Sequence, residues 1–401
     1  MDIKQILTAL SVGTDKITSE EELLAKLKHS QETKKPLRVK LGIDASGPDI
    51  HLGFAVVLRK LRQFQDFGHT AVLIIGDFTG SIGDPTGRSK TRPQLTDEQI
   101  KTNMARYKEQ VFKILKPDQT EFRYNSEWSN PLTGKDIINL ASKYTLARII
   151  EREDFSQRLK QGIPLHVHEI LYPLFQGYDS VAVRADIELG GADQYWNLLV
   201  GRELQREFGQ EPQVVITMPL LEGTDGRQKM SKSYNNYIGI AEPPKEIFGK
   251  TMSIPDEMII KYCRLCTNLS ESDIKQMESD MKAGKNPKLF KECLGKELVR
   301  LYYSAECAEN TCKEFDEVFK QKKMPIEIEE FKVASNKINI IELLIQSKLM
   351  PSKSEARRKI QEGAVEIDGE KIKDVYFELV VDSPKIIKVG KRGFRRIIPS
   401  V

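Results

Sequence analysis

Residues 38–75 read RVKLGIDASGPDIHLGFAVVLRKLRQFQDFGHTAVLII, and this stretch decides the fold. Its first part, residues 38–44, is an apolar run that stops at the turn formers of residues 45–49. From Leu52 onward, apolar side chains recur at a period near 3.6, which predicts a helix before a second apolar run at residues 71–75. Strand, loop, helix and strand in this order predict a right-handed βαβ unit with parallel strands.

His51 and Gly53 stand at the start of the predicted helix. Open parallel sheets bind ligands at the carboxyl ends of their strands, and the helix start faces that edge. Helix N-termini attract phosphate, and glycine lets a ligand approach the backbone closely. Taken alone, the pattern also fits an ordinary helix cap with an incidental histidine.

Three later segments also place glycines after a predicted strand. Residues 76–88 form a predicted loop with four glycines after the second strand, and Asp84 lies between a glycine and a proline. Residues 190–194 follow a short predicted strand and begin a helix. Residues 223–233 form a predicted loop in which two lysines and two serines follow two glycines. Flexible surface turns are the alternative, but the lysine loop suits a phosphate clamp.

The predicted helix at residues 168–179 places three polar side chains on one face. Tyr172, Gln176 and Asp179 are spaced i, i+4 and i+7 among apolar neighbours. A solvated stripe would show the same spacing. A proline and a glycine within the helix weaken it, so the segment is not arranged for helix stability. This combination favours the wall of a pocket.

Composition predicts a soluble globular protein of two or three domains. Of the 401 residues, 30% are charged and 39% are hydrophobic, and the apolar runs are too short for a membrane span. The N-terminus lacks the features of a signal or transit peptide, so we expect a cytoplasmic protein that does not bind membranes. Cys263 and Cys266 have the spacing of zinc ligands without a second pair, and we expect buried thiols and no protein-bound metal.

The C-terminal part differs from the rest of the chain in its charge and in its sequence pattern. Residues 337–401 contain 14 Lys and Arg against 9 Asp and Glu, so this part carries a net charge of +5 while the whole chain carries only +4. Two short helices and a hairpin about Asp368-Gly369 are predicted there. RNA contact is favoured over a merely solvated basic face. The RNA-binding candidates are Lys353, Arg357, Arg358, Lys359, Lys391 and Arg392.

Helical patterns also occupy residues 18–28, 96–115, 137–150 and 241–320, and residues 321–337 read as a linker.

Several of these motifs together resemble one enzyme family. His51-Leu52-Gly53-Phe54 and Lys229-Met230-Ser231-Lys232-Ser233, in this order, resemble the two motifs of class I aminoacyl-tRNA synthetases. The spacing Tyr172-x-x-x-Gln176-x-x-Asp179, with Gly190-Gly191-x-Asp193-Gln194 and Gly83-Asp84-Pro85, is similar to the bacterial-type tyrosyl-tRNA synthetases. The resemblance runs from about residue 33 to the end, and the last part resembles an S4-type RNA-binding domain.

The resemblance implies an α/β fold with a Rossmann-type doubly wound parallel sheet. Residues 1–240 would form the catalytic domain with an N-terminal helix, and residues 241–320 a helical, anticodon-side domain. A linker at residues 321–337 would lead to a small α+β, S4-like RNA-binding domain at residues 338–401. The implied partners are L-tyrosine, ATP with Mg²⁺ as its complex, and tRNA(Tyr), and the implied assembly is a homodimer.

The resemblance also assigns roles to the matching positions. The catalytic candidates are His51, Ser46, Lys229 and Lys232. The ATP- and adenylate-binding candidates are Asp44, Gly53, Gly191, Asp193 and Lys232. The tyrosine-binding candidates are Asp84, Tyr172, Gln176, Asp179 and Gln194. Asp179 would accept the hydrogen bond of the substrate phenol. A carboxylate that attacks the α-phosphate is already ionised, so cations and amide donors on the phosphate matter more than a strong base.

Three positions depart from the family pattern. Ala45 stands where proline is usual, and Ser46 stands where threonine is usual but keeps a hydroxyl. Phe54 replaces a second histidine that helps to bind ATP, and phenylalanine has no donor to offer. We therefore expect no catalytic role for Phe54.

Three alternatives remain open from the sequence. One is a synthetase paralogue that binds RNA with weak or no tyrosine activation, because of Phe54. The intact lysine loop and the tyrosine pocket argue against it. A tryptophan-specific sister enzyme is disfavoured by Asp179 and the S4-like tail. A nucleotidyltransferase that does not act on tRNA would have no use for that tail.

Overall fold

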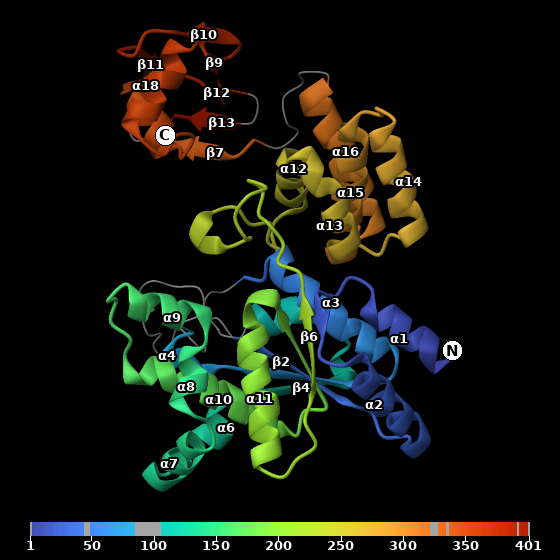
Figure 1. Ribbon diagram of the computed structural model, residues 1–401. Coiled ribbons are helices and arrows are strands. Elements are labelled where there is room, and N and C mark those ends of the chain that lie inside the picture. The colour runs from blue at the N-terminus through green and yellow to red at the C-terminus, as the bar shows by residue number, and fades with distance from the viewer. Residues whose placement is uncertain are drawn as a thin grey trace. The chain divides into compact units, whose positions relative to one another are not determined.

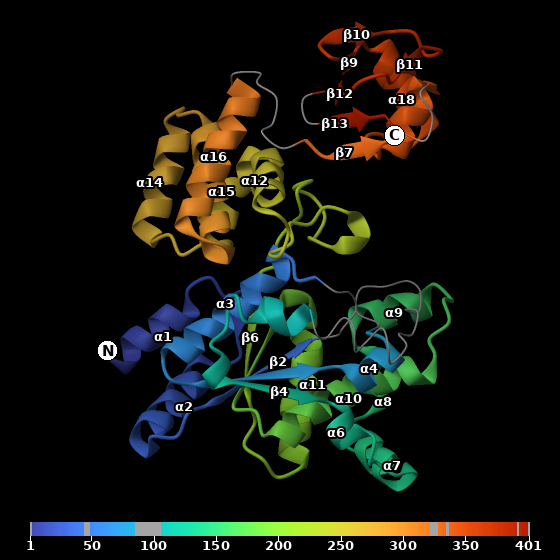
Figure 2. The ribbon, with the colours of Figure 1, turned by 180° about the vertical axis from the view of Figure 1, so that it is seen from behind.

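The computed structural model describes residues 2–43, 49–84, 106–320, 328–333, 337–390 and 393–399 (Figures 1 and 2). The chain forms two compact units, Met1–Ala308 and Glu309–Val401. Among the described residues, no helix is both long and apolar enough to cross a membrane.

The first unit is built on a six-stranded sheet with the order β1-β6-β5-β2-β3-β4. Its strands are β1 (Lys16–Ile17), β2 (Arg38–Ile43), β3 (Thr70–Ile75), β4 (Thr120–Tyr124), β5 (Ile187–Gly191) and β6 (Val214–Met218). Strand β1 pairs antiparallel with β6, and the other neighbours pair in parallel. The inner strands are almost fully buried, as parallel strands covered on both faces must be.

The chain winds in both directions from β2. It passes through α3 (Leu52–Asp66) to β3 and on to β4, and it returns through α10 (Val167–Val183) to β5 on the other side of β2. Helix α11 (Tyr195–Glu207) then leads to β6, and α10 and α11 pack side by side (Figures 1 and 2). The winding direction therefore reverses between β2 and β5, which is where open α/β sheets bind ligands.

The predicted βαβ unit is confirmed. Strands β2 and β3 pair in parallel from Arg38↔Thr70 to Ile43↔Ile75. Helix α3 begins at Leu52 with His51 as its N-cap, and its apolar face is fully buried against the sheet. The helical region after residue 240 is also confirmed.

The described residues of the first unit also form further helices. They are α1 (Ile3–Ser11), α2 (Glu20–Thr33), α4 (Asp77–Ile82), α6 (Ser126–Ser129), α7 (Gly134–Ser142), α8 (Leu146–Ile150), α9 (Glu153–Lys160), α12 (Pro244–Ser253), α13 (Ile259–Cys266), α14 (Glu271–Lys282), α15 (Pro287–Tyr302) and α16 (Ala305–Lys320), which continues into the second unit.

Two local predictions were wrong. The stretch after β3, predicted as a loop, contains helix α4, because Asp77 fixes its first turn by accepting the backbone N–H of Phe78 and that of Ser126. The single helix predicted at residues 137–150 is divided into α7 and α8, because Thr145 caps a new helix by accepting the N–H of Arg148. Of the helix predicted at residues 96–115, residues 96–105 lie outside the described residues, and residues 106–111 are helical.

The second unit contains a five-stranded sheet with the order β10-β9-β12-β13-β7 and a separate pair, β8 and β11. Its elements are β7 (Glu330–Lys332), β8 (Lys337–Asn339), α17 (Ile340–Gln346), α18 (Lys353–Gln361), β9 (Val365–Ile367), β10 (Glu370–Ile372), β11 (Glu378–Val380), β12 (Lys385–Val389) and β13 (Gly393–Ile398). Both predicted helices and the hairpin are confirmed. Asp368 and Gly369 have positive φ angles of 48° and 90°, as a two-residue hairpin turn requires.

The predicted linker at residues 321–337 is wrong in its second half. Glu330–Lys332 is strand β7, which pairs in parallel with β13, and Lys337 begins strand β8. The physical reason is apolar burial, because Val333 is 1% exposed within the core of this unit and Phe331 packs against that core. The first half of the predicted linker, residues 321–327, lies outside the described residues.

Candidate active site

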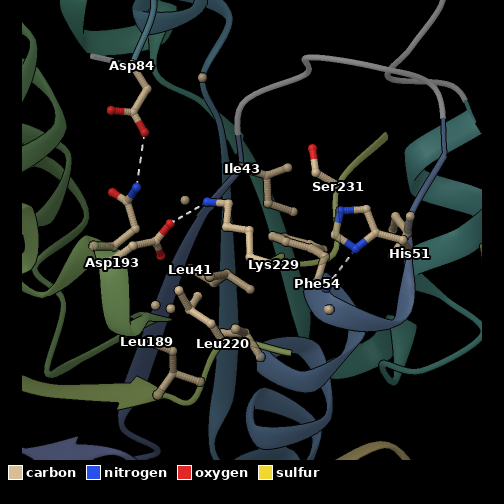
Figure 3. A pocket seen from close by; sticks show the side chains of 18 of the residues that line it. Leu41, Ile43, His51, Phe54, Asp84, Leu189, Asp193, Leu220, Lys229 and Ser231 are labelled. Carbon is tan, nitrogen blue, oxygen red and sulfur yellow. Dashed lines mark hydrogen bonds and ion pairs between the residues drawn. The ribbon is translucent and has the colours of Figure 1, made fainter. Parts of the chain in front are cut away.

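A cavity of about 380 Å³ opens at the carboxyl ends of β2 and β5, where the winding direction reverses (Figure 3). Every described catalytic, ATP-binding and tyrosine-binding candidate lines it. These residues are His51, Gly53, Asp84, Tyr172, Gln176, Asp179, Gly191, Asp193, Gln194, Lys229 and Lys232. Asp44 and Ser46, together with Ala45, lie outside the described residues. Segments far apart in the sequence therefore converge on one cavity.

His51 is held as a neutral imidazole at the start of α3. Its Nδ1 accepts the backbone N–H of Phe54 at 3.3 Å, so the ring hydrogen lies on Nε2 (Figure 3). Burial, together with the charges of Lys232 and Lys229, lowers the pKa of His51 to about 4. The side chain can therefore cap its helix through one nitrogen and donate a hydrogen bond from the other.

Gly53, an ATP-binding candidate, also lies close to two side chains of the protein. A Cβ at this position would lie 3.2 Å from Nδ1 of His51 and 3.4 Å from Cβ of Met230. The backbone N–H of Gly53 also donates to the sulfur of Met230 at 3.3 Å. Glycine thus lets the histidine ring and the lysine loop pack onto the first turn of α3.

Phe54 occupies the first turn of α3 and lines the cavity with a partly exposed side chain (Figure 3). The ring is neither sealed in the core nor turned away from the site. The position at which the family pattern has a histidine therefore still faces the cavity.

One buried amide holds the lysine loop in its conformation. Asn236 is 3% exposed and accepts the N–H of Ser231 at 2.8 Å. Its amide group donates to the carboxylate of Asp225 at 3.1 Å and to the carbonyls of residues 228 and 229. Asn236 could not be predicted from the sequence, because an asparagine in a polar loop gives no signal of burial. It holds the backbone that carries Lys229.

The two lysines of this loop differ in environment. Lys229 forms an ion pair with Asp193 at 2.7 Å, and its side chain remains 51% exposed, so the pair can be exchanged at little cost (Figure 3). Burial lowers the pKa of Lys232, while the nearby Asp49 opposes that shift. Both ammonium groups face the cavity and can meet an anionic ligand.

Helix α10 forms the opposite wall with the three predicted side chains. Tyr172 and Asp179 are each 3% exposed, and Gln176 lies between them on the same face. The side-chain oxygen Oε1 of Gln176 is buried and has no hydrogen-bond partner among the described residues. A buried acceptor of this kind is costly unless a ligand satisfies it, so it points to a bound donor such as an ammonium group.

Asp179 has a strongly perturbed carboxyl group. Burial raises the pKa of Asp179 to about 7, against the opposing effects of Lys40, Trp128 and Asn125. Trp128 Nε1 donates to Oδ1 at 2.9 Å, and Asn125 Nδ2 donates to Oδ2 at 3.4 Å. Neither donor could be predicted from the sequence, because both lie more than 50 positions from Asp179. They fix the orientation of its carboxyl group.

Gly177 weakens α10 for a reason other than the one inferred from the sequence. A Cβ on Gly177 would lie 3.1 Å from the backbone nitrogen of Gly201 and 2.9 Å from Leu204. Glycine therefore allows close packing of α10 against α11. It serves helix packing directly and the pocket only indirectly.

Asp84 and Gln194 are linked across the mouth of the cavity. Gln194 Nε2 donates to Asp84 Oδ2 at 3.0 Å (Figure 3). Asn197 Nδ2 donates to Gln194 Oε1 at 3.0 Å. Arg152 in turn donates to Asn197 at 3.2 Å. This chain of polar groups sets both candidate side chains in place.

The RNA-binding candidates lie in the second unit. Lys353, Arg357, Arg358 and Lys359 are on α18. Arg358 pairs with Glu355 of the same helix, and both Arg358 and Lys359 pair with Glu362, the residue that caps its C-terminus. Lys391 and Arg392 lie outside the described residues.

The cysteine pair of α13 consists of buried thiols. Burial raises the pKa values of Cys263 and Cys266 to about 12, so both stay protonated at neutral pH.

Comparisons with known proteins agree along the whole chain. The family model "tRNA synthetases class I (W and Y)" matches residues 31–320, and "Tyrosine--tRNA ligase SYY-like C-terminal domain" matches residues 314–394. The chain is 53% identical to a tyrosine–tRNA ligase of Thermotoga maritima, covering 95% of this chain and 94% of the relative. It is 52% identical to that of Carboxydothermus hydrogenoformans, with 99% and 98% covered.

Solved structures share the fold. A tyrosyl-tRNA synthetase of Archaeoglobus fulgidus complexed with L-tyrosine aligns with a TM-score of 0.62 at 24% identity, covering 78% of this chain and 100% of that one. A C-terminally truncated mitochondrial tyrosyl-tRNA synthetase of Aspergillus nidulans aligns with a TM-score of 0.64 at 19% identity, covering 79% and 94%. With a matching family model over most of its length and relatives of about 50% identity, this chain belongs to the class I tRNA synthetases of the tryptophan and tyrosine family.

Proposed function

We propose that this protein is a tyrosine–tRNA ligase that works in two steps. In the first step, the tyrosine carboxylate attacks the α-phosphate of ATP, and pyrophosphate leaves to give tyrosyl-adenylate. In the second step, a terminal ribose hydroxyl of tRNA(Tyr) attacks the activated carbonyl, and AMP leaves. Two relatives that are named tyrosine–tRNA ligases, at 53% and 52% identity over nearly their full length, support this reaction.

The observation that carries the proposal is the single cavity that unites both halves of the site. One wall presents His51, Lys229 and Lys232, and the other presents Gln176 and Asp179. We assign the first group to the phosphates, since neutral imidazole and ammonium groups stabilise charge that develops on them. We assign the second group to tyrosine, with the unpaired oxygen of Gln176 and the carboxylate of Asp84 for its ammonium group.

Asp179 is our choice for the phenol of the substrate. An ionised carboxylate that already accepts two hydrogen bonds still has lone pairs for a third donor. Phenylalanine would leave a buried carboxylate without this donor, which costs about 1–3 kcal/mol or more.

The ATP site uses the remaining candidates. We assign Gly191 and Asp193 to the ribose, and Gln194 to the carboxyl end of the substrate. Lys229, now paired with Asp193, would exchange that partner for phosphate. Asp44 and Ser46 remain predictions for the adenylate.

Magnesium fits this chain as part of the ATP complex. Among the described residues, no group of three His, Cys, Asp or Glu side chains is placed to hold a metal ion. Mg²⁺ commonly keeps several waters and reaches a protein through one or two carboxylates plus substrate phosphates. Asp49 lines the cavity and would serve this purpose. The bound ion would neutralise part of the phosphate charge.

The proposal includes a homodimer with tRNA bound through the second unit. Large apolar side chains are exposed within one segment of the first unit, as expected of a surface that a partner covers. They are Ile138, Leu146, Leu159 and Val167. Light scattering with size-exclusion chromatography would test the dimer, and Ile138→Asp should weaken it. The cytoplasmic location remains a prediction, which cell fractionation would test.

The decisive experiment is amino-acid-dependent exchange between pyrophosphate and ATP, followed by charging of tRNA(Tyr). We expect exchange with tyrosine, far less with phenylalanine or tryptophan, and tyrosine-dependent charging. Comparable exchange with phenylalanine would contradict the role of Asp179. RNA binding without any tyrosine-dependent exchange would instead favour the alternative that Phe54 suggested, a synthetase paralogue that binds RNA with weak or no tyrosine activation.

A further inference from the structure

We propose that Lys40 and Glu188, a fully buried ion pair beside the tyrosine wall, control the charge of Asp179 and thereby the discrimination between tyrosine and phenylalanine. Both would be positioning residues that act through Asp179. The inference rests on the proposed function, because it deepens the assignment of Asp179 to the substrate phenol.

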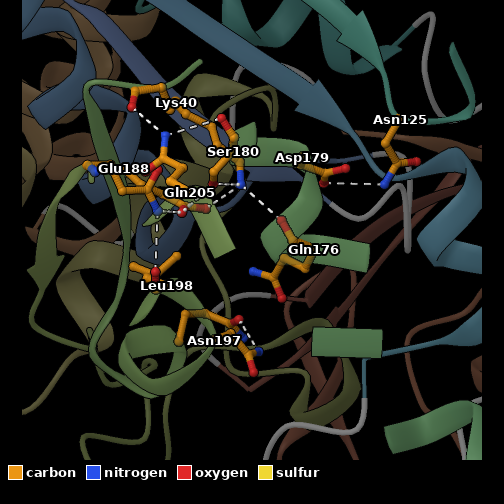
Figure 4. A network of polar contacts seen from close by, with 12 residues as sticks. Lys40, Asn125, Gln176, Asp179, Ser180, Glu188, Asn197, Leu198 and Gln205 are labelled. Carbon is orange, nitrogen blue, oxygen red and sulfur yellow. Dashed lines mark hydrogen bonds and ion pairs between the residues drawn. The ribbon is translucent and has the colours of Figure 1, made fainter. Parts of the chain in front are cut away.

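The pair joins the two central strands of the sheet at the point where the winding reverses. Lys40 on β2 and Glu188 on β5 are register partners in the parallel ladder. Their side chains are 0% and 2% exposed, and the ammonium lies 2.7 Å from Oε1 (Figure 4). Burial of two charges is expensive and contributes little net stability, so a pair in this place invites a functional explanation.

The ammonium group of Lys40 is attached to the turn of α10 that carries Asp179. It donates to Ser180 Oγ at 2.7 Å and to the backbone carbonyl of Gln176 at 3.1 Å (Figure 4). Ser180 Oγ donates to Glu188 Oε2 at 3.0 Å. These hydrogen bonds hold α10 at residues 176 and 180, which lie on either side of Asp179 in the sequence.

The other side of the network is closed by α11 and the residue before β6. Gln213 donates to Glu188 Oε2. A Cβ on Gly201 would lie 2.9 Å from Gln213 Nε2 and 2.9 Å from Ser180 Oγ. Glycine at 201 thus leaves room for the polar network, which is enclosed on all of these sides.

The two charges act on Asp179 in opposite directions. Burial raises the pKa of Asp179 to about 7, the charge of Lys40 lowers it, and the charge of Glu188 raises it. Asp179 therefore titrates near neutral pH, where a change in either neighbouring charge alters its protonation.

Other charged groups lie on the elements packed against α10, and several already have partners elsewhere. Asp77 of α4 accepts from Ser126, and Arg202 of α11 pairs with Glu22. The charged residues on the helices that pack against α10 are Asp77 on α4, Lys135 and Asp136 on α7, and Arg202, Glu203, Arg206 and Glu207 on α11. Besides Asp179, the titratable residues of α10 itself are His168, Glu169, Tyr172 and Tyr178. Lys40 and Glu188 are the two side chains whose charges act on Asp179 from the sheet.

The charge of Asp179 decides what the pocket tolerates. An ionised carboxylate requires a donor such as the phenol, and phenylalanine leaves it unpaired. A protonated carboxyl group is neutral, so its burial beside phenylalanine costs much less. Discrimination should therefore increase as pH rises through the pKa of Asp179, and Lys40 should keep the discriminating form populated at neutral pH.

The test compares Lys40→Met with Glu188→Gln. The first removes a positive charge, and the second removes a negative charge, while both keep the approximate size of the side chain. We expect the acid limb of the pH profile of kcat/KM for tyrosine to move up by about one pH unit in Lys40→Met and down by about one unit in Glu188→Gln. At pH 7, the tyrosine/phenylalanine ratio should fall in the first variant and rise in the second.

Infrared spectroscopy gives a second readout that needs no turnover. The carboxylic band of protonated Asp179, isolated as a difference from Asp179→Asn, should titrate near pH 7 in the unaltered protein and shift in the same opposite directions. If Lys40→Met does not fold, Glu188→Gln still carries its own signed expectation. The double variant, which removes both charges, should return the titration close to its original position.

Arg158→Met is the matched control. Arg158 forms a buried ion pair with Glu169 at 2.7 Å, also on α10 but away from Asp179. This variant should lower stability and leave the titration in place. Titrations that stay fixed, or that move together in Lys40→Met and Glu188→Gln, would overturn the inference. If the unaltered protein lacked tyrosine-dependent exchange, the proposed function would fail, and the infrared titration would still decide whether the pair controls Asp179.

Discussion

Phe54→His should accelerate formation of tyrosyl-adenylate. Phe54 lies in the first turn of α3 and its partly exposed side chain lines the cavity, so an imidazole in its place would face the phosphate side of the site. Such a ring would not be sealed in the core without a partner. One hydrogen bond to a charged phosphate contributes about 1.5 kcal/mol, which corresponds to roughly a tenfold faster reaction.

The protonation of the new side chain follows from that of its neighbour. Lys229 and Lys232 help to keep the pKa of His51 at about 4. The same cations should keep a histidine at position 54 neutral at pH 7, so it would act as a hydrogen-bond donor. The backbone N–H of residue 54 would continue to donate to His51.

Single-turnover measurement of adenylate formation is the appropriate assay, with thermal unfolding measured alongside. Phe54→Leu serves as the control, because it removes the ring without adding a donor. We expect the histidine variant to be faster than both the unaltered protein and the leucine control. A histidine variant of equal stability that is no faster than the leucine control would refute the reasoning and show that another group already fills this place.

Three further outcomes are expected. Lys232→Ala should slow adenylate formation about a hundredfold, which corresponds to about 3 kcal/mol, while tyrosine binding changes little, because the charge of Lys232 acts mainly in the transition state. Pre-steady-state kinetics would measure this, and an unchanged rate would exclude that role. Removing the chain after Lys320, and so before β7, should preserve tyrosine activation but abolish efficient tRNA charging, and normal charging would contradict this division. Gly177→Ala should reduce the unfolding free energy by about 1–3 kcal/mol through the clash with α11. Gly249→Ala in α12, where a Cβ meets nothing within 4 Å, should be neutral or stabilising in the same thermal unfolding assay.

Local periodicity predicted the elements whose signal lies within a few consecutive residues. The βαβ unit follows from an apolar strand, a helical repeat and a second apolar strand between Arg38 and Ile75. The hairpin follows from Asp368-Gly369, whose backbone angles suit a two-residue turn. In both places, the residues that determine the structure are neighbours in the sequence.

The errors arose where distant partners decide the local structure. Strand β7 at residues 330–332 has few features of its own and forms because β13, more than 60 positions later, provides a parallel partner. Helix α4 depends on the bond between Asp77 and Ser126, which no local pattern reveals. Gly177 was correctly identified as unusual, but its reason is the backbone of Gly201.

The candidate site shows the same division between local motif and distant partner. His51, Lys229 and the α10 face could be found from short motifs, because each motif is local. Trp128 and Asn125 could not, although they hold the carboxyl group on which tyrosine recognition would depend.

The ion pair of Lys40 with Glu188 joins residues far apart in the sequence, yet the sequence contains a sign of it. A lysine in the middle of an apolar run is unexpected in a strand covered on both faces, because an unpaired buried charge is very costly. Its presence therefore requires a carboxylate on a neighbouring strand. Glu188, the second residue of β5, is such a carboxylate, but only the β2–β5 register identifies it as the partner. Once the register is known, the alternation of side chains places both charges on the α10 face, beside the carboxyl group that would bind the substrate phenol. A charged residue within an otherwise apolar strand is thus a local sign of a functional ion pair, and the sheet topology identifies its partner.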